Sequence, residues 1–102
     1  MNDINESGFR TPRNTSTQPP DPAQVATAEA FLRTLARAPR VTAASPNSYA
    51  LKHAAERWGE ANGLEPYVSN GALLQAAMNL GIPVQQWRAP VAINGSVGVS
   101  LV

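Results

Sequence analysis

The sequence predicts a small α+β domain: three short helices, then a C-terminal antiparallel β-hairpin, with a disordered N-terminal arm in front. Three segments carry apolar residues at three- or four-residue spacing behind helix-capping residues. After Ile82 the apolar period changes to two, which is typical of strands. The first 22 residues are rich in Pro, Asn, Ser and Thr. We therefore predict an arm over residues 1–22 and a single domain over residues 23–102.

The arm has too few apolar side chains to offset the entropy lost when its backbone is ordered. Phe9 is its one aromatic residue. Within the segment from Gly8 to Arg13, Phe9 is placed to anchor an extended strand on a partner. The alternative is a solvated tail in which Phe9 has no role, and we favour that interpretation.

The first helix is predicted to run from Asp21-Pro22 to about Ala38. Asp is a preferred N-cap residue, and Pro at the first helical position loses no hydrogen bond. Pro39 then ends the helix. One face carries an apolar stripe that consists of Val25, Ala28, Leu32 and Leu35, with Phe31 beside it.

The second helix is predicted to begin at Ser45-Pro46, or at the competing cap Ser48, and to run through Trp58. Gly59 is expected to end it in the left-handed conformation. Polar residues follow, and they predict an exposed linker up to Pro66.

The third helix is the most apolar segment of the chain. Ser69 is its predicted N-cap, its body runs from Ala72 to Leu80, and Gly81 ends it with Pro83 just beyond. Most of its circumference is apolar, so we expect this helix at the centre of the core.

Alternating apolar residues around Asn94-Gly95 predict the C-terminal hairpin. A two-residue loop would put Val91 and Val97 on opposite faces. A three-residue loop over Ile93–Gly95 pairs Val91 with Val97 and keeps the apolar side chains on one face. A third short strand over Val84–Trp87 is an alternative, because a hairpin alone is marginally stable.

Length and composition exclude several classes of function. The 102 residues have room for one core, and the absence of cysteine excludes disulfides, thiolate catalysis and cysteine-ligated metals. His53 is the single histidine, so we expect neither a metal nor another cofactor. The net charge of +1 is too small to mark the whole surface for nucleic acid. The sequence shows no signal peptide or membrane span, which favours a cytoplasmic protein without membrane contact.

His53 and Glu56 lie three residues apart on the second predicted helix, where they could form an acid–base pair. Lys52 and Glu56 have the spacing of a one-turn ion pair. No nucleophile stands near them in a recognised motif, and the sequence has no glycine-rich phosphate loop. We therefore predict that the protein is not an enzyme and that His53 has a structural role.

Arg33, Arg37 and Arg40 form the one basic cluster, with the first two on the same face of the first predicted helix. Such a cluster can contact phosphates of a nucleic acid. The favoured alternative is that these charges stabilise the C-terminal end of the helix dipole.

The stretch that leads into Gln85, Gln86 and Arg88 resembles a helix-turn-helix motif. In that motif these three side chains would contact bases or phosphates. Pro83 and Pro90 leave too little room between them for a recognition helix, so a short edge strand is the favoured interpretation.

The segment Tyr67–Gly71 contains the start of the third helix, with Ser69 as its cap. Free N–H groups at a helix start can hold an anion or an acidic side chain of a partner. The favoured alternative is a plain cap in which Gly71 allows close packing against Tyr49 or Trp58.

We predict a non-enzymatic accessory or regulatory module, of the inhibitor or adaptor type, that acts through protein–protein contacts. A second copy of the chain, paired through the outer strand of the hairpin, is one candidate partner. Aromatic residues carry a large share of interface energy. The predicted partner-binding residues are Phe9, Tyr67, Ser69, Asn70, Gly71 and Trp87.

The alternative function is a small DNA-binding regulator of the transcriptional or plasmid and phage type. Ionic strength separates the two functions, because phosphate contacts weaken steeply with added salt. The nucleic-acid-binding residues in this alternative are Arg33, Arg37, Arg40, Gln85, Gln86 and Arg88.

Overall fold

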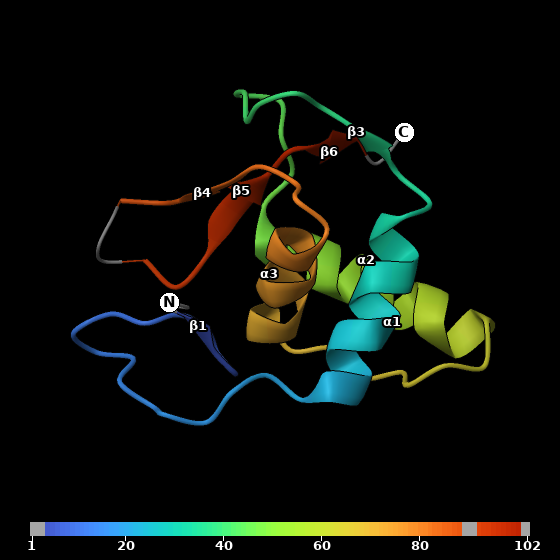
Figure 1. The fold of residues 1–102 in the computed structure, drawn as a ribbon, viewed down its shortest axis with the longest axis horizontal. Helices are drawn as coiled ribbons and strands as arrows, with labels where there is room; N and C mark the ends of the chain where they lie inside the picture. Colours follow the sequence, from blue (N-terminus) through green and yellow to red (C-terminus); the bar gives the residue numbers. More distant parts are fainter. Residues whose placement is uncertain (1–3, 89–91, 101–102) are drawn as a thin grey trace.

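The computed structural model describes residues 4–88 and 92–100 and has an α+β fold, as predicted. Figure 1 shows the helices packed together, with the short strands beside them. The strands form three two-stranded antiparallel sheets, β1–β2, β3–β6 and β4–β5. The elements in chain order are β1 (Ile4–Asn5), β2 (Gly8–Phe9), α1 (Pro22–Leu32), β3 (Ala36–Arg37), α2 (Ser48–Ala61), α3 (Asn70–Asn79), β4 (Val84–Gln86), β5 (Gly95–Val97) and β6 (Val99–Ser100).

Helix α3 lies at the centre of the core, which confirms the prediction from its composition. It contacts α1, α2, β1, β2, β4 and β5. Leu73 and Leu74 are fully buried, together with Leu32 of α1 and Leu51 of α2. Each such side chain contributes about 1.5–3 kcal/mol through burial. Helix α3 therefore links the other two helices to the strands, while α1 and α2 also contact each other directly.

The predicted caps of α1 and α3 are confirmed. Asp21 Oδ1 accepts a hydrogen bond from Ala23 N at 2.8 Å, and Ser69 Oγ accepts one from Ala72 N at 3.1 Å. Gly81, just beyond α3, has a φ of +72°, the left-handed conformation that the sequence predicts there.

The predicted ends of α2 are wrong at both termini. Asn47, not Ser45 or Ser48, is the N-cap, and its Oδ1 accepts from Ala50 N at 2.7 Å. Ser48 is buried inside the helix, where its hydroxyl accepts from the backbone N–H of β5 at 3.1 Å. Gly59 also lies inside the helix and does not end it. A Cβ at this position would come within 2.7 Å of Thr27 on α1. Tight packing explains this glycine better than helix termination.

Helix α1 ends at Leu32, more than one and a half turns before the predicted end near Ala38. Thr34 turns the chain out of the helix, since its N–H and its hydroxyl both donate to Phe31 O, at 2.9 and 2.6 Å. Residues 36–37 then pair with β6 as strand β3. Arg33 and Arg37 therefore do not share a helix face, and α1 has no basic residue in its last turn.

The C-terminal strands are present, but their pairing differs from the predicted hairpin. Val97 pairs with Val84, because β5 is antiparallel to β4. The alternative of a third strand at this position is thus confirmed, and that strand is the partner of β5. Val91, the predicted partner of Val97, lies outside the described residues. The connection between β4 and β5 is longer than the predicted three-residue loop, and both strands also contact α3.

The N-terminal segment, residues 4–21, is packed on the domain where a disordered arm is predicted. Ile4 is 7% exposed and Phe9 8% exposed, and both belong to the hydrophobic core. Asn5, also buried, donates to Asn14 Oδ1 at 3.1 Å and to Ser16 O at 3.0 Å. The polar groups of the segment thus satisfy one another while its two apolar side chains enter the core. Phe9 is a core residue and not an exposed anchor for a partner.

Candidate functional site

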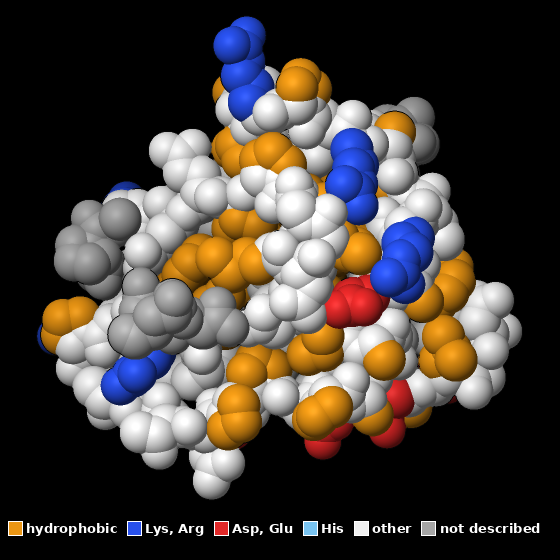
Figure 2. Space-filling model, viewed as in Figure 1, with side chains coloured by type: hydrophobic (Ala, Val, Ile, Leu, Met, Phe, Trp, Pro, Cys, Tyr) orange, Lys and Arg blue, Asp and Glu red, His pale blue; other side chains and the backbone are white. Residues whose placement is uncertain are grey.

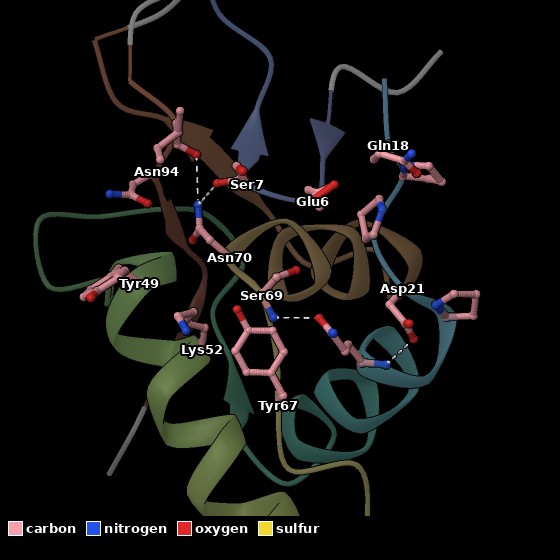
Figure 3. Close-up of a pocket in the computed structure, with 15 residues that line it drawn as sticks. Glu6, Ser7, Gln18, Asp21, Tyr49, Lys52, Tyr67, Ser69, Asn70 and Asn94 are labelled. Carbon is pink, nitrogen blue, oxygen red and sulfur yellow. Dashed lines mark hydrogen bonds between the residues drawn. The ribbon is translucent and has the colours of Figure 1, made fainter. Parts of the chain in front are cut away.

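A cavity of about 760 Å³ opens where the N-terminal segment, the start of α1, α2 and the start of α3 meet. Figure 3 shows side chains from all four parts around it. We call it the Tyr67 cavity. The lining residues that matter for its chemistry are Glu6, Asp21, Tyr49, Lys52, Tyr67 and Asn70, with Ser69 and Asn94 beside them.

Two tyrosines and a lysine form one side of the Tyr67 cavity. Tyr49 is 54% exposed and Tyr67 58% exposed. The ammonium of Lys52 lies 5.8 Å from the centroid of the Tyr49 ring and 5.5 Å from that of the Tyr67 ring. These distances are within the range of cation–π attraction. Both rings therefore attract the Lys52 ammonium and still have exposed surface.

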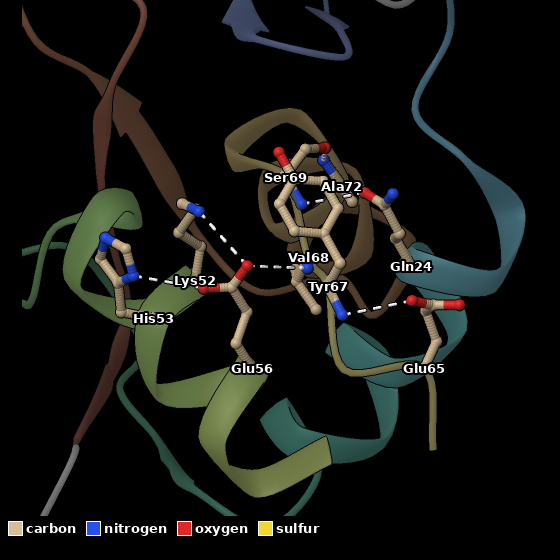
Figure 4. Close-up of polar contacts among 9 residues, drawn as sticks. All are labelled: Gln24, Lys52, His53, Glu56, Glu65, Tyr67, Val68, Ser69 and Ala72. Atoms are coloured by element: carbon tan, nitrogen blue, oxygen red, sulfur yellow. Dashed lines mark hydrogen bonds and ion pairs between the residues drawn. The ribbon is translucent and has the colours of Figure 1, made fainter. Parts of the chain in front are cut away.

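Glu56 holds the polar groups below this side of the cavity in place (Figure 4). Its Oε2 accepts from Lys52 Nζ at 3.4 Å and from Val68 N at 3.1 Å. Its Oε1 lies 3.2 Å from His53 Nδ1, and the His53 ring packs edge-on against Tyr49. The Glu56 carboxylate thus connects the segment before α3 to α2. The His53–Glu56 pair noted in the sequence therefore positions neighbouring groups.

Three backbone N–H groups at the start of α3, those of Ser69, Gly71 and Ala72, are occupied by acceptors of the protein itself. Ser69 N donates to Gln24 Oε1 at 2.9 Å, and Gly71 N donates to Glu6 O at 3.1 Å. The anion or acidic side chain expected at this helix start would meet donors that are already used. Gly71 packs against the backbone of Asn5 and Glu6, not against Tyr49 or Trp58.

Two buried acceptors beside the cavity are unpaired. Asn70 is 8% exposed, and its Nδ2 donates to Ser7 O at 3.1 Å and to Ile93 O at 3.2 Å. Asn70 Oδ1 and Asn94 Oδ1 are both buried, with no hydrogen-bond partner among the described residues. Figure 3 shows the Asn70 nitrogen turned to Ser7 and its oxygen on the other side, toward Lys52 and Tyr49. An unpaired buried acceptor costs about 1–3 kcal/mol.

The charge left on the cavity wall is negative. Glu6 and Asp21 are exposed carboxylates, and neither forms an ion pair within residues 4–88 and 92–100. Lys52 is the cation on the wall, and Glu56 neutralises it at 3.4 Å. The site thus combines negative charge, unpaired acceptors and exposed aromatic rings.

Trp87 lines a separate cavity of about 650 Å³, together with Gln85, Gln86 and Arg88. Trp87 is 40% exposed, as a surface anchor requires, and its Nε1 donates to Ser96 Oγ at 2.8 Å. Gln86 Nε2 donates to a backbone carbonyl at 2.9 Å, so its amide is engaged within the protein. The structure therefore brings Tyr67, Ser69 and Asn70 to one cavity and Trp87 to another.

Arg33, Arg37 and Arg40 are all exposed, although they do not form one helix face. Figure 2 shows basic side chains spread over the side of the molecule where α1 ends and β3 lies. Arg33 is paired with Glu29 at 3.7 Å. Within the part of the chain that the structure describes, Arg37 and Arg40 have no such carboxylate partner.

Sequence reasoning missed most contributors to the Tyr67 cavity, among them Glu6, Asp21, Tyr49, Lys52 and Asn94. The spacing of Tyr49 and Lys52 on a predicted helix was a usable signal, because residues three apart share a helix face. Glu6 gave no signal, since it lies in a segment that the composition marks as disordered.

Among the described helices none is long and apolar enough to cross a membrane. The described residues also contain no group of three or more His, Asp or Glu side chains placed to hold a metal ion. Comparisons with protein-family models, with curated proteins and with solved structures gave no match.

Proposed function

We propose that the protein is a non-enzymatic binding module, of the adaptor or inhibitor type, that takes up a segment of a partner protein in the Tyr67 cavity. The observation that carries this proposal is the pair of half-exposed tyrosines, Tyr49 and Tyr67, at the side of a cavity of about 760 Å³. Tyrosine supplies contact area at low entropic cost and is enriched at interface hot spots. The cysteine-free composition fits a cytoplasmic location, which is part of the proposal.

The polar groups at the site support binding better than catalysis. His53 and Lys52 are both engaged by the same carboxylate of Glu56, which also accepts a backbone N–H. A general base needs an acceptor that is free to take a proton from a substrate. A recognition surface needs side chains fixed in place, and this network supplies that rigidity.

The proposal is tested by selecting displayed random peptides on the protein and measuring their affinity for a double variant, Tyr49→Ala with Tyr67→Ala. We expect the double variant to bind at least about tenfold more weakly, because hot-spot aromatics each contribute more than about 1 kcal/mol. Met78→Ala is the matched control, since Met78 is 44% exposed but does not line the cavity. Urea unfolding of each variant checks that the fold is retained.

Two results would contradict this function. One is a selection that enriches no peptide. The other is a set of peptides whose affinities are the same for the wild type and the double tyrosine variant, which would place the binding surface elsewhere.

Nucleic-acid binding is the second candidate, and the observation that favours it is the exposure of Arg33, Arg37 and Arg40, on a side of the molecule where Figure 2 shows basic side chains. If Arg37 and Arg40 each contact a phosphate, the double variant Arg37→Ala with Arg40→Ala should reduce the salt slope of duplex DNA affinity by about two. Titrations between about 50 and 200 mM salt measure this slope. Arg57→Ala, an exposed arginine on α2, is the control. An unchanged slope, or no binding at low salt, rejects this candidate.

A further inference from the structure

We propose that the Tyr67 cavity recognises a basic side chain, a lysine ammonium or an arginine guanidinium, on the segment that it binds. This inference rests on the proposed function and adds the chemistry of the partner. Three independent features of the cavity support it: its charge, its hydrogen-bonding groups and its aromatic side.

The charge of the wall favours a cation. Glu6 and Asp21 contribute two carboxylates, and Lys52 is already neutralised by Glu56, which is not among the lining residues. The Asp21 carboxylate also caps α1, where its Oδ1 accepts a hydrogen bond from Ala23 N. Among the described residues the Glu6 carboxylate has no ion-pair partner, and it is exposed at the cavity. A cation that enters therefore meets an uncompensated negative wall.

The hydrogen-bonding groups favour a donor. The N–H groups of Ser69 and Gly71 and the amide N–H₂ of Asn70 all have acceptors within the protein. The unpaired buried side-chain atoms among the described residues are acceptors, Asn70 Oδ1 and Asn94 Oδ1, and a donor reaches them when the side chains that cover them shift. A carboxylate or phosphate brings further acceptors and would leave both oxygens unpaired. An ammonium or guanidinium brings only donors.

The aromatic side favours the same chemistry. Tyr49 and Tyr67 already hold one ammonium, that of Lys52, at 5.8 and 5.5 Å from their ring centroids. Both rings remain more than half exposed, so each keeps surface for a second group. The aliphatic stem of a lysine or arginine can pack on that surface while its charged end points to Glu6 and Asn70.

The probe is N-acetyl-lysine methylamide, compared with N-acetyl-norleucine methylamide, which has the same four-carbon chain without the ammonium. Amide shifts in ¹⁵N–¹H NMR spectra report binding. We expect shifts at Tyr67, Ser69 and Asn70 with the lysine compound and binding about twofold to fivefold weaker with the norleucine compound. Added salt should reduce this difference.

Charge-neutralising variants test the wall itself. Glu6→Gln and Asp21→Asn should each weaken binding of the lysine compound, and Asn preserves the helix cap at position 21. Glu60→Gln is the matched control, because Glu60 is an exposed carboxylate on α2 outside the cavity. Its affinity should equal that of the wild type.

The outcomes separate this inference from the proposed function. Equal shifts with both compounds, or no shift with either, overturn the preference for a basic side chain. Selected peptides that bind through the tyrosines but carry no Lys or Arg also overturn it, while the proposed function stands. Loss of affinity when the Lys or Arg of a selected peptide is replaced supports it.

Discussion

Replacing Phe9 by Ala is expected to lower the free energy of unfolding by about 3–5 kcal/mol, as removal of a buried aromatic ring does. Phe9 is 8% exposed and is part of the hydrophobic core. Its ring packs so closely on β5 that a Cβ on Gly95 would lie 3.0 Å from Phe9 Cε2. A phenylalanine on a solvated arm would change stability by less than about 0.5 kcal/mol.

Urea unfolding followed by tryptophan fluorescence measures this loss directly. A loss of about 3 kcal/mol corresponds to a fall of roughly 12–24 °C in the melting temperature of a domain of this size. Tyr67→Ala is the control, since Tyr67 is 58% exposed and its removal should leave stability close to that of the wild type. A Phe9→Ala variant as stable as this control would mean that the N-terminal segment does not pack on the domain.

The helices were the most predictable part of the fold, because their signals are local. The caps Asp21 and Ser69 and the left-handed Gly81 act within a few residues of their position. The dense apolar sequence of α3 likewise predicts burial without knowledge of its neighbours. The error at the start of α2 fits the same rule, because adjacent Asn47 and Ser48 are both good caps and the hydroxyl of Ser48 is used in a tertiary bond to β5.

Strand pairing was less predictable, because it is decided by distant segments. Residues 36–37 show no strand pattern of their own, and they become β3 by pairing with β6 more than sixty residues later. The predicted hairpin used the nearest turn signal, Asn94-Gly95. The structure instead uses Ile93 O as an acceptor for Phe9 N and for the Asn70 amide. This alternative use of the loop cannot be read from alternation of apolar residues alone.

The N-terminal segment was mispredicted for a related reason. Composition counts the apolar residues within a segment, whereas stability depends on where those residues are buried. Ile4 and Phe9 are few, but both reach a core that the helices have already built. Asn5 and Asn14 hydrogen-bond to each other and so satisfy polar groups that the composition marks as solvated.

The candidate site was only half predictable. Tyr67, Ser69 and Asn70 were selected because they surround a helix start, and they do line one cavity. An anion at this helix start would meet N–H groups that are already used, because Ser69 N donates to Gln24 and Gly71 N donates to Glu6. Those acceptors come from α1 and from the N-terminal segment, and their position depends on tertiary packing.

Replacing Gly71 by Ala gives the second large expected effect. The sign of the change in the free energy of unfolding shows whether local helix propensity or tertiary packing dominates at this position. In an exposed helix this change stabilises by about 0.5–1 kcal/mol, because Ala is the better helix former. In this protein a Cβ at position 71 would overlap Asn5 O and lie 2.8 Å from the carbonyl of Glu6. Both are backbone atoms that cannot rotate away. We therefore expect destabilisation by about 1–3 kcal/mol, as for other overpacked sites.

Gly63→Ala is the comparison for this variant, since a Cβ there meets nothing within 4 Å and only the φ of +71° opposes it. Its loss should be about 1 kcal/mol, and the N-terminal segment should keep its contacts. In the Gly71→Ala variant the amide of Glu6 should exchange faster with solvent, because the segment that carries its bond to Gln18 O is displaced. A stabilised Gly71→Ala variant would show that the backbone of Asn5 is not held against α3.

Combining Phe9→Ala with Gly71→Ala tests whether the N-terminal segment docks as a unit. If Gly71→Ala displaces the segment, Phe9 has already left the core in that background, and Phe9→Ala should then cost little more. The loss in the double variant should fall short of the sum of the single losses by about 1 kcal/mol or more, the size of coupling that connected sites show. Additive losses would mean that Phe9 stays buried when Gly71 is changed. In that case the contact at Gly71 and the contact at Phe9 would hold the segment independently, and Glu6 would keep its place at the Tyr67 cavity.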